Sequence, residues 1–333
     1  MNKNLDEYVN FLIQNKNYNV YYCFYEKSCI KIMTNLPDLI YDIYINEKIS
    51  NEPNGKIIGE VIVINDDNLF DKRYDFEEYD DSLFTPKTHK MYIEGVENSN
   101  YNFGNCNLNI FHYPYPGIEF YDDNKRRYVS IVSFKKECLN RIKNGIKKIL
   151  ASFNCQKKYY PLHAMAVCDK SNGYLFIAGG HQGKTTFFLN LIDYFYPLND
   201  DIIFWKATDN DIKIKGCGIL PTIREGTSDF YHKEFNNKSI KYFEKSVKLN
   251  SIFFFEFGDV CLIEKVEIKD YLKKVLRSIE NHRHIEVNEL FLKSFNVLKN
   301  KDFYKFTISE NYNDIIDYFE KWIERREHNG KKN

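Results

Sequence analysis

The 333-residue sequence lacks any apolar run long enough to cross a membrane. Its longest purely apolar stretches are only a few residues, such as IFFF at 252–255, which Glu256 follows. A transmembrane helix needs about 20 apolar residues. The first residues, MNKNLDEYVN, contain no apolar segment of the signal-peptide type. We therefore expect a cytoplasmic protein that has no membrane partner.

An excess of charge of either sign is also absent. Lys and Arg together number 47, as do Asp and Glu, so the formal net charge is zero. Proteins that coat nucleic acid need a positive field, and no known nucleic-acid-binding motif is present. We expect no nucleic-acid partner.

The eight cysteines are scattered and form no CxxC pair. A disulfide-stapled domain or a zinc ribbon would cluster them, so we expect free thiols. What the chain does have is 43% hydrophobic and 17% aromatic residues. That composition supports a sizeable core, and the length suits one large domain or two ordinary ones.

Residues 1–132 are expected to form a strand-rich domain. Runs of β-branched and aromatic residues alternate there with turn clusters, as in NVYYCFY, CIKIM, DIYINEKI and GKIIGEVIVI. Apolar residues then recur every three or four positions up to Phe153, which predicts a helix over 133–153. We place a connecting helix at 133–158 and a second domain at 159–325, in an α/β fold that is α+β overall.

The second domain carries a glycine-rich loop. The sequence predicts strands over 162–167 and 174–178, then the loop AGGHQGKT at 178–185, then an amphipathic helix over 184–194. This is the Walker A spacing with Ala first, in the strand–loop–helix context that the motif requires. Backbone N–H groups of such a loop surround phosphate oxygens, Lys184 reaches the β- and γ-phosphates, and the Thr185 hydroxyl ligates Mg²⁺. The candidate nucleotide-binding residues are Gly179, Gly180, His181, Gln182, Gly183, Lys184, Thr185 and Thr186.

Two adjacent acids, Asp200 and Asp201, follow the loop and a strand-like FYPL. After a P-loop, one carboxylate can hold Mg²⁺ and another can accept the proton of an attacking hydroxyl. A polar turn is the alternative interpretation of an arbitrary Asp-Asp pair. The spacing does not decide which acid has which task. We expect ATP, or another nucleoside triphosphate, and Mg²⁺ as cofactors.

These residues resemble the catalytic domain of HPr kinase/phosphorylase and its relatives. The resemblance is carried by LHA at 162–164, GKT at 183–185 and the pair of acids, and IKIKGCGIL at 212–220 is similar to the family's Glu-Ile-Arg-Gly-Leu-Gly-Ile signature. Residues 251–272 resemble a strand, strand and helix of smaller relatives encoded beside modified-peptide precursors. The family has a P-loop core related to phosphoenolpyruvate carboxykinase and phosphorylates serine.

The resemblance implies a role for each matching position. Thr185 and Asp200 would bind Mg²⁺, Asp201 would be the base for the acceptor hydroxyl, and Lys184 would act on the phosphates being transferred. His163, which the residues alone do not single out, would support the catalytic acid.

The segment IKIKGCGIL at 212–220, here called the second signature, departs from the family's signature at two positions. Lys213 stands where the family has Glu, and Lys215 where it has Arg. The family's Glu would assist the metal site, so its absence leaves a reverse, phosphorylase reaction open to question. Asp211 and Glu225 are candidates to replace it.

The expected protein is an ATP- and Mg²⁺-dependent kinase that transfers a γ-phosphoryl group to a hydroxyl, most simply a serine of a small protein or peptide. One alternative is a catalytically silent nucleotide-binding regulator or scaffold, which the altered signature favours. Another is a small-molecule kinase acting on an amino acid or a sugar, which would need a closed cavity rather than an open groove. A homo-oligomer is also left open.

Overall fold

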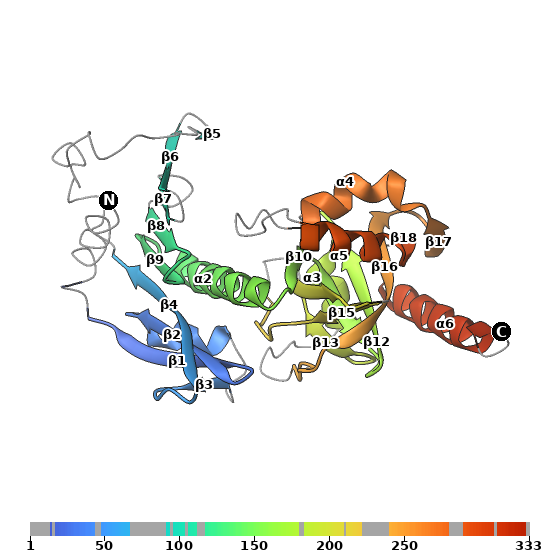
Figure 1. Ribbon diagram of the computed structural model, residues 1–333, viewed down its shortest axis with the longest axis horizontal. Helices are drawn as coiled ribbons and strands as arrows, with labels where there is room; N and C mark the ends of the chain where they lie inside the picture. Colours follow the sequence, from blue (N-terminus) through green and yellow to red (C-terminus); the bar gives the residue numbers. More distant parts are fainter. Residues whose placement is uncertain are drawn as a thin grey trace. The chain divides into compact units, whose positions relative to one another are not determined.

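The structure is a computed structural model that describes residues 14, 17–43, 48–66, 91–93, 96–103, 106–111, 117–179, 183–209, 211–221, 240–279, 289–309 and 312–330. The chain divides into two compact units, Met1–Phe153 and Asn154–Asn333 (Figure 1). The boundary falls inside helix α2 (Lys135–Gln156). Among the described residues, no helix combines the length and the apolar character that a bilayer span needs.

The first unit is built on a nine-stranded mixed sheet in the order β3-β1-β2-β4-β9-β8-β7-β6-β5. Strand β4 is parallel to both of its neighbours, β2 and β9. The strands are β1 (Asn19–Tyr25), β2 (Ser28–Thr34), β3 (Ile49–Ser50), β4 (Lys56–Asn65), β5 (Met91–Ile93), β6 (Val96–Phe103), β7 (Cys106–Phe111), β8 (Gly117–Asp122) and β9 (Arg127–Val132).

Three of the four quoted strand predictions are confirmed, as β1, β2 and β4. The fourth, DIYINEKI, is wrong at its start, because Asp42 ends the 3-10 helix η1 (Pro37–Asp42). Pro37 lies in the first turn of η1, where its fixed φ suits a helical turn and its missing N–H costs nothing. Residues 44–47 lie outside the described residues. So do residues 67–90, which include most of an acidic stretch at 66–81.

Helix α2 packs one face against this sheet. Ile142, Ile146 and Ile149, three or four positions apart as the sequence predicted, are fully buried. Gly145 lies on the same face, where an added Cβ would meet the Tyr128 ring at 2.5 Å. A residue without a side chain therefore lets the helix approach β9 closely.

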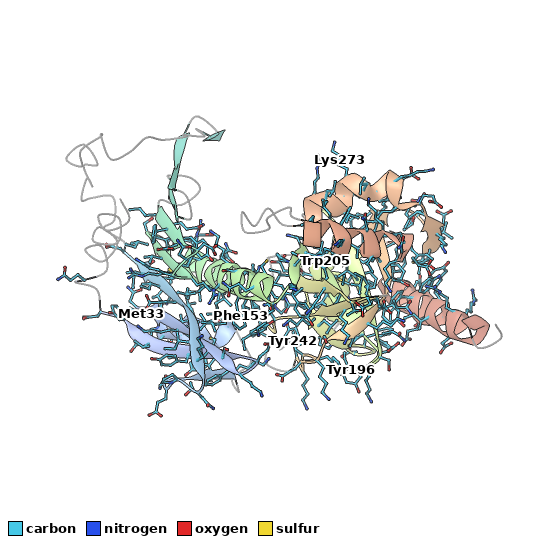
Figure 2. The ribbon with its side chains drawn as sticks, viewed as in Figure 1. Met33, Phe153, Tyr196, Trp205, Tyr242 and Lys273 are labelled. Carbon is cyan, nitrogen blue, oxygen red and sulfur yellow. The ribbon has the colours of Figure 1, made fainter. Side chains whose placement is uncertain are left out.

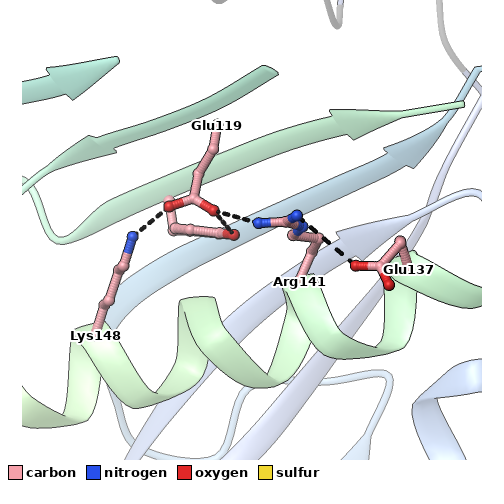
Figure 3. Close-up of polar contacts among 5 residues, drawn as sticks. Glu119, Glu137, Arg141 and Lys148 are labelled. Atoms are coloured by element: carbon pink, nitrogen blue, oxygen red, sulfur yellow. Dashed lines mark hydrogen bonds and ion pairs between the residues drawn. The ribbon is translucent and has the colours of Figure 1, made fainter. Parts of the chain in front are cut away.

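A buried carboxylate also ties α2 to the sheet (Figure 3). Glu119 of β8 accepts hydrogen bonds from Tyr128 Oη at 2.9 Å, from Arg141 Nη1 at 3.0 Å and from Lys148. Burial alone would raise the pKa of the Glu119 carboxyl. The charges of Lys148 and Arg141, with the hydrogen bonds, outweigh burial and hold that pKa below its ordinary value of 4.5. Glu119 is therefore ionised in the folded protein at neutral pH.

Replacing Glu119 by glutamine should loosen α2 from the sheet. The change leaves Arg141 and Lys148 without their buried counter-charge. We therefore expect the free energy of α2 opening to fall by about 2 kcal/mol at pH 7. Since the folded-state pKa is lowered, the stabilisation is present above pH 4.5 and is lost as the pH falls through the lowered pKa. The measure is hydrogen–deuterium exchange of α2 peptides at pH 7 and at acid pH. Glu137→Gln, which removes a more distant partner of Arg141 at 3.7 Å, should change exchange little.

The second unit contains another mixed sheet, in the order β10-β14-β15-β16-β12-β11-β13, with β18 beside β16 and β17 beside β18. Strands β12, β16 and β18 are mutually parallel. The strands are β10 (Tyr160–His163), β11 (Met165–Cys168), β12 (Asn172–Ile177), β13 (Tyr196–Asn199), β14 (Ile202–Ala207), β15 (Ile212–Lys215), β16 (Val247–Phe257), β17 (Leu262–Val266) and β18 (Asp302–Ile308).

Helices cover both faces of the second sheet, in a three-layer α/β arrangement. The helices are α3 (Lys184–Leu191), α4 (Ile268–Ser278), α5 (Glu289–Lys299) and α6 (Tyr312–Gly330). On one face, Phe187 of α3 and Phe319 of α6 pack edge-on against Phe176 of the sheet. On the other, α4 and α5 join a core cluster that contains Trp205 (Figure 2). Many of the aromatic residues of this unit are thus core residues.

The strand, strand and helix predicted over 251–272 correspond to the end of β16, to β17 and to the start of α4. The strand predicted over 162–167 is in fact two, because β10 pairs with β14 whereas β11 pairs with β12 and β13, so the chain changes neighbours at Ala164. All seven cysteines whose side chains are described are free thiols, as expected.

Candidate functional site

The site lies at one edge of the second sheet, where two strands end together. Strands β12 and β13 flank β11 and are both antiparallel to it, so they run parallel to each other. The register pairs Met165 with Phe176, near the end of β12, and Ala166 with Asn199, the end of β13. The glycine-rich loop and the acid pair therefore leave the sheet at the same edge, where α/β sheets commonly bind ligands.

Helix α3 begins with a backbone conformation that favours glycine. Gly183 is its N-cap and has φ +73°, in the left-handed region. The helix is shorter than predicted and is buried on nearly all sides rather than amphipathic: Phe187, Phe188 and Leu191 are all fully buried. Gly180, His181 and Gln182 of the predicted loop lie outside the described residues.

The Lys184 side chain is buried and folds back over the loop. Its Nζ donates hydrogen bonds to the carbonyl oxygens of Ala178 at 2.9 Å and Gly179 at 3.1 Å. Its ammonium group therefore lies beside the loop, where a phosphate bound by the loop would be within its reach. Thr186, in the same first turn of α3, is also buried.

The Thr185 hydroxyl and the Asp200 carboxylate are in direct contact. Thr185 Oγ1 donates to Asp200 Oδ2 at 2.9 Å, and Asp200 is only 4% exposed. The contact joins the first turn of α3 to the end of β13. It brings together the two residues that the resemblance implied as metal ligands.

Asp201 turns to a different partner. Its Oδ1 lies 3.4 Å from His163 Nε2, and both side chains are more than a third exposed. The β10–β14 register brings them together, because His163 pairs with Ile202, the residue after Asp201. The two adjacent acids thus have different surroundings. Asp200 is buried against Thr185, and Asp201 is partly exposed beside a histidine.

The second signature lies against the strand that ends at the acids. A Cβ on Gly216 would be 1.8 Å from the Leu198 carbonyl oxygen, so any side chain there would push β13 aside. Gly218 has φ +73°, and its N–H donates to the Asn199 side chain at 3.1 Å. The glycines of this segment therefore help to hold the end of β13 in place.

Two further residues near the acids were not found from the sequence. Asn199 fastens β13 to Gly218, as described, and Tyr242 is a buried residue (Figure 2) whose hydroxyl donates to the Ile219 carbonyl at 3.0 Å. Burial raises the pKa of Tyr242, and the nearby charges of Asp200 and Cys217 raise it further. Nothing in the linear spacing points to either residue, because both act through contacts between distant segments.

Asp211, a candidate to assist the metal site, lies away from the acid pair. It lies at the start of β15, which pairs with the end of β14, so the length of β14 separates it from Asp201. Its carboxylate binds Lys248 at 2.6 Å and also Lys301. Burial opposes ionisation, but these lysines outweigh it and lower the pKa of Asp211 to about 2. Glu225, the other candidate, lies outside the described residues.

The described residues fit a nucleotide-bound Mg²⁺ better than a metal held by protein alone. Within the described ranges, no group of three or more His, Cys, Asp or Glu side chains is arranged to hold a metal. Thr185 and Asp200 instead offer two adjacent oxygen donors beside a buried lysine. Mg²⁺ is typically held by one or two protein oxygens together with substrate phosphates. The donor set is therefore of the right chemical kind.

No family model matches the sequence, and no curated protein matches it either. Among solved structures, the chain is similar to the HPr(Ser) kinase/phosphatase from Coxiella burnetii, at 12% identity and a TM-score of 0.30. The match covers 52% of this chain and 96% of that one. This is a distant likeness.

Proposed function

We propose that this protein is a Mg²⁺- and ATP-dependent kinase that transfers a phosphoryl group to the hydroxyl of a serine in a small protein or peptide. The observation that carries the proposal is the meeting of two residue pairs at one sheet edge. Thr185 contacts Asp200 at 2.9 Å, and Asp201 lies 3.4 Å from His163. One pair is suited to a metal-bound phosphate and the other to a hydroxyl.

The phosphate half of the site is formed by the first turn of α3. Lys184 would leave the carbonyl groups of Ala178 and Gly179 for the β- and γ-phosphates, and the helix N-terminus would add its partial positive charge. Thr185 and Asp200 would hold Mg²⁺, which supplies charge neutralisation on the phosphates when bound. Catalysis of this kind is mainly positioning and electrostatic stabilisation.

The acceptor half of the site is formed by Asp201 and His163. Asp201 would accept the proton of the attacking hydroxyl, and His163 would orient the carboxylate by the contact at 3.4 Å. Both side chains are partly exposed, so a side chain carried by another polypeptide can reach them. That exposure favours a protein or peptide acceptor over a small molecule, which would need an enclosed cavity.

The test is mass spectrometry of candidate acceptors after incubation with the purified protein and Mg-ATP. We expect one acceptor among free serine, an HPr-type protein and the short peptides encoded beside the gene to gain a single phosphate, and chelation of Mg²⁺ to abolish the gain. A phosphate on free serine alone would favour the small-molecule kinase. Calorimetric binding of Mg-ATP without transfer to any acceptor would favour the silent regulator.

A further inference from the structure

Three lysines form one row across three neighbouring strands of the second sheet. The register pairs Lys206 of β14 with Lys213 of β15, and pairs Lys213 with Lys248 of β16. Both pairings are antiparallel, and residues directly opposite in such a pair share a face, with Cα atoms about 5 Å apart. The three lysine side chains therefore leave the sheet side by side on one face. We call Lys206, Lys213 and Lys248 the lysine row.

The row is on the face that turns away from the core cluster. The neighbouring residues Ala207, Ile212, Ile214 and Val247 belong to or pack against that cluster, and successive side chains in a strand point to opposite faces. Lys213 is exposed, and the Lys248 side chain is 61% exposed. Lys206, at the other end, is half-buried. The row is thus open to a partner at Lys213 and Lys248.

Such a row costs stability, because like charges directly opposite each other repel. At one end of the row, the Asp211 carboxylate offsets the charge of Lys248. At the other end, the Tyr159 ring offsets the charge of Lys206, whose Nζ lies 5.3 Å from the ring centroid. Lys213, in the middle, forms no ion pair with any described residue. A local arrangement that breaks the ordinary pairing rules is typical of a functional surface. An anionic partner would remove the repulsion.

The lysine row shares its face with the acceptor half of the proposed site. His163 pairs with Ile202, and Lys206 is an even number of residues further along β14, so the two side chains lie on the same face. Lys206 lies four positions beyond Ile202, about 13 Å along the strand, and Phe204 between them on the same face is fully buried. An extended acceptor chain that passes over the covered Phe204 would span this distance in about four residues.

We propose that the lysine row binds an acidic segment of the polypeptide acceptor, about four residues from the hydroxyl that receives the phosphate. That this acidic segment belongs to the phosphoryl acceptor rests on the proposed function. An acidic peptide fits better than nucleic acid. The Tyr159 ring already faces the ammonium groups of Lys206 and Lys215, whereas single-stranded nucleic acid is usually held by rings on which bases stack.

The experiment measures binding by fluorescence anisotropy in the absence of nucleotide. The probe is a fluorescein-labelled dodecapeptide with one serine and a run of glutamates four residues from it, and the matched peptide has glutamines instead. We expect the glutamate peptide to bind and the glutamine peptide not to, and we expect added salt to weaken binding. Lys213→Glu should weaken it about tenfold or more.

The control variant is Lys273→Glu, which makes the same change of charge at an exposed position on α4 (Figure 2). It should bind as the unaltered protein does. Lys213→Glu should also raise the melting temperature, because it replaces two like-charge pairs by two opposite-charge pairs. Weaker binding by a more stable protein cannot result from misfolding.

Three results would overturn the lysine-row proposal. The first is equal affinity for the glutamate peptide in both variants and the unaltered protein, and the second is equal affinity for the two peptides. The third is a labelled single-stranded oligonucleotide that binds more tightly than the glutamate peptide and loses its binding in Lys213→Glu. The two proposals fail separately. Peptide binding that depends on Lys213 without phosphoryl transfer counts against the kinase alone. If an acceptor is phosphorylated and Lys213→Glu leaves its KM unchanged, the result counts against the lysine row alone.

Discussion

Replacing Lys184 by alanine is expected to reduce phosphoryl transfer by about 10³-fold or more. In the structure this side chain is buried at the start of α3 and bound to the carbonyl groups of Ala178 and Gly179. A cation in that position is the group best placed to neutralise charge that develops on transferred phosphate, and losing one such contact costs several powers of ten in rate. The measurement is the initial rate of acceptor phosphorylation under saturating Mg-ATP.

The same substitution has a structural effect that the experiment must separate from catalysis. Alanine leaves the two loop carbonyl groups without their donor, at a cost of about 1 kcal/mol. The fold should survive, because α3 is held chiefly by its buried phenylalanines. Circular dichroism and the melting temperature therefore serve as checks, and Lys273→Ala, at an exposed position, is the matched control. Full activity of Lys184→Ala would disprove the phosphate half of the site.

Replacing Asp201 by asparagine is expected to lower kcat by about 10²- to 10⁴-fold, the range for loss of a general base. The side chain is partly exposed and lies 3.4 Å from His163, whereas Thr185 donates to Asp200. The change should therefore leave the affinity for Mg-ATP almost unaltered, and leave the fold intact because the shape is kept. The measurement combines calorimetric titration of Mg-ATP with the steady-state rate of phosphorylation.

Asp209→Asn is the control for this second experiment, since it removes an exposed acid at the far end of β14. A variant at Asp201 that loses nucleotide binding as well as transfer would place this acid with the metal instead of the acceptor. A variant that loses neither would remove Asp201 from the reaction. His163→Ala should lower the rate less than Asp201→Asn does, because a residue that orients the base is one step removed from the proton.

Much of the local structure can be predicted from the sequence because it depends on neighbours in the chain. The alternation of β-branched and aromatic residues predicts β1, β2 and β4, and the three- and four-residue spacing of isoleucines predicts α2. The segment over 172–191 also follows a local rule, since a buried strand, a glycine with positive φ and a helix occur in that order. The failure at Asp42 has a local cause too, because Pro37 starts a helical turn.

The grouping of the site residues could not be obtained in this way. Asp200 and Asp201 are consecutive, and their composition and spacing are compatible with either task. Their separation depends on β13 lying beside β11 and on β10 pairing with β14, which brings Thr185 to one acid and His163 to the other. Pairings between strands depend on contacts across the whole sheet, and single-sequence periodicity does not record them.

The same distinction applies to the lysines of β14, β15 and β16. In the sequence they are three separate charges, and nothing in their spacing groups them. Strand register makes them one row, and it also moves Asp211 to the far end of β14 from the acids it was a candidate to assist. The sequence by itself determined which chemical groups are available and which segments are strands or helices. The tertiary structure decided which of those groups meet, because side chains far apart in the chain become neighbours only through the pairing of strands.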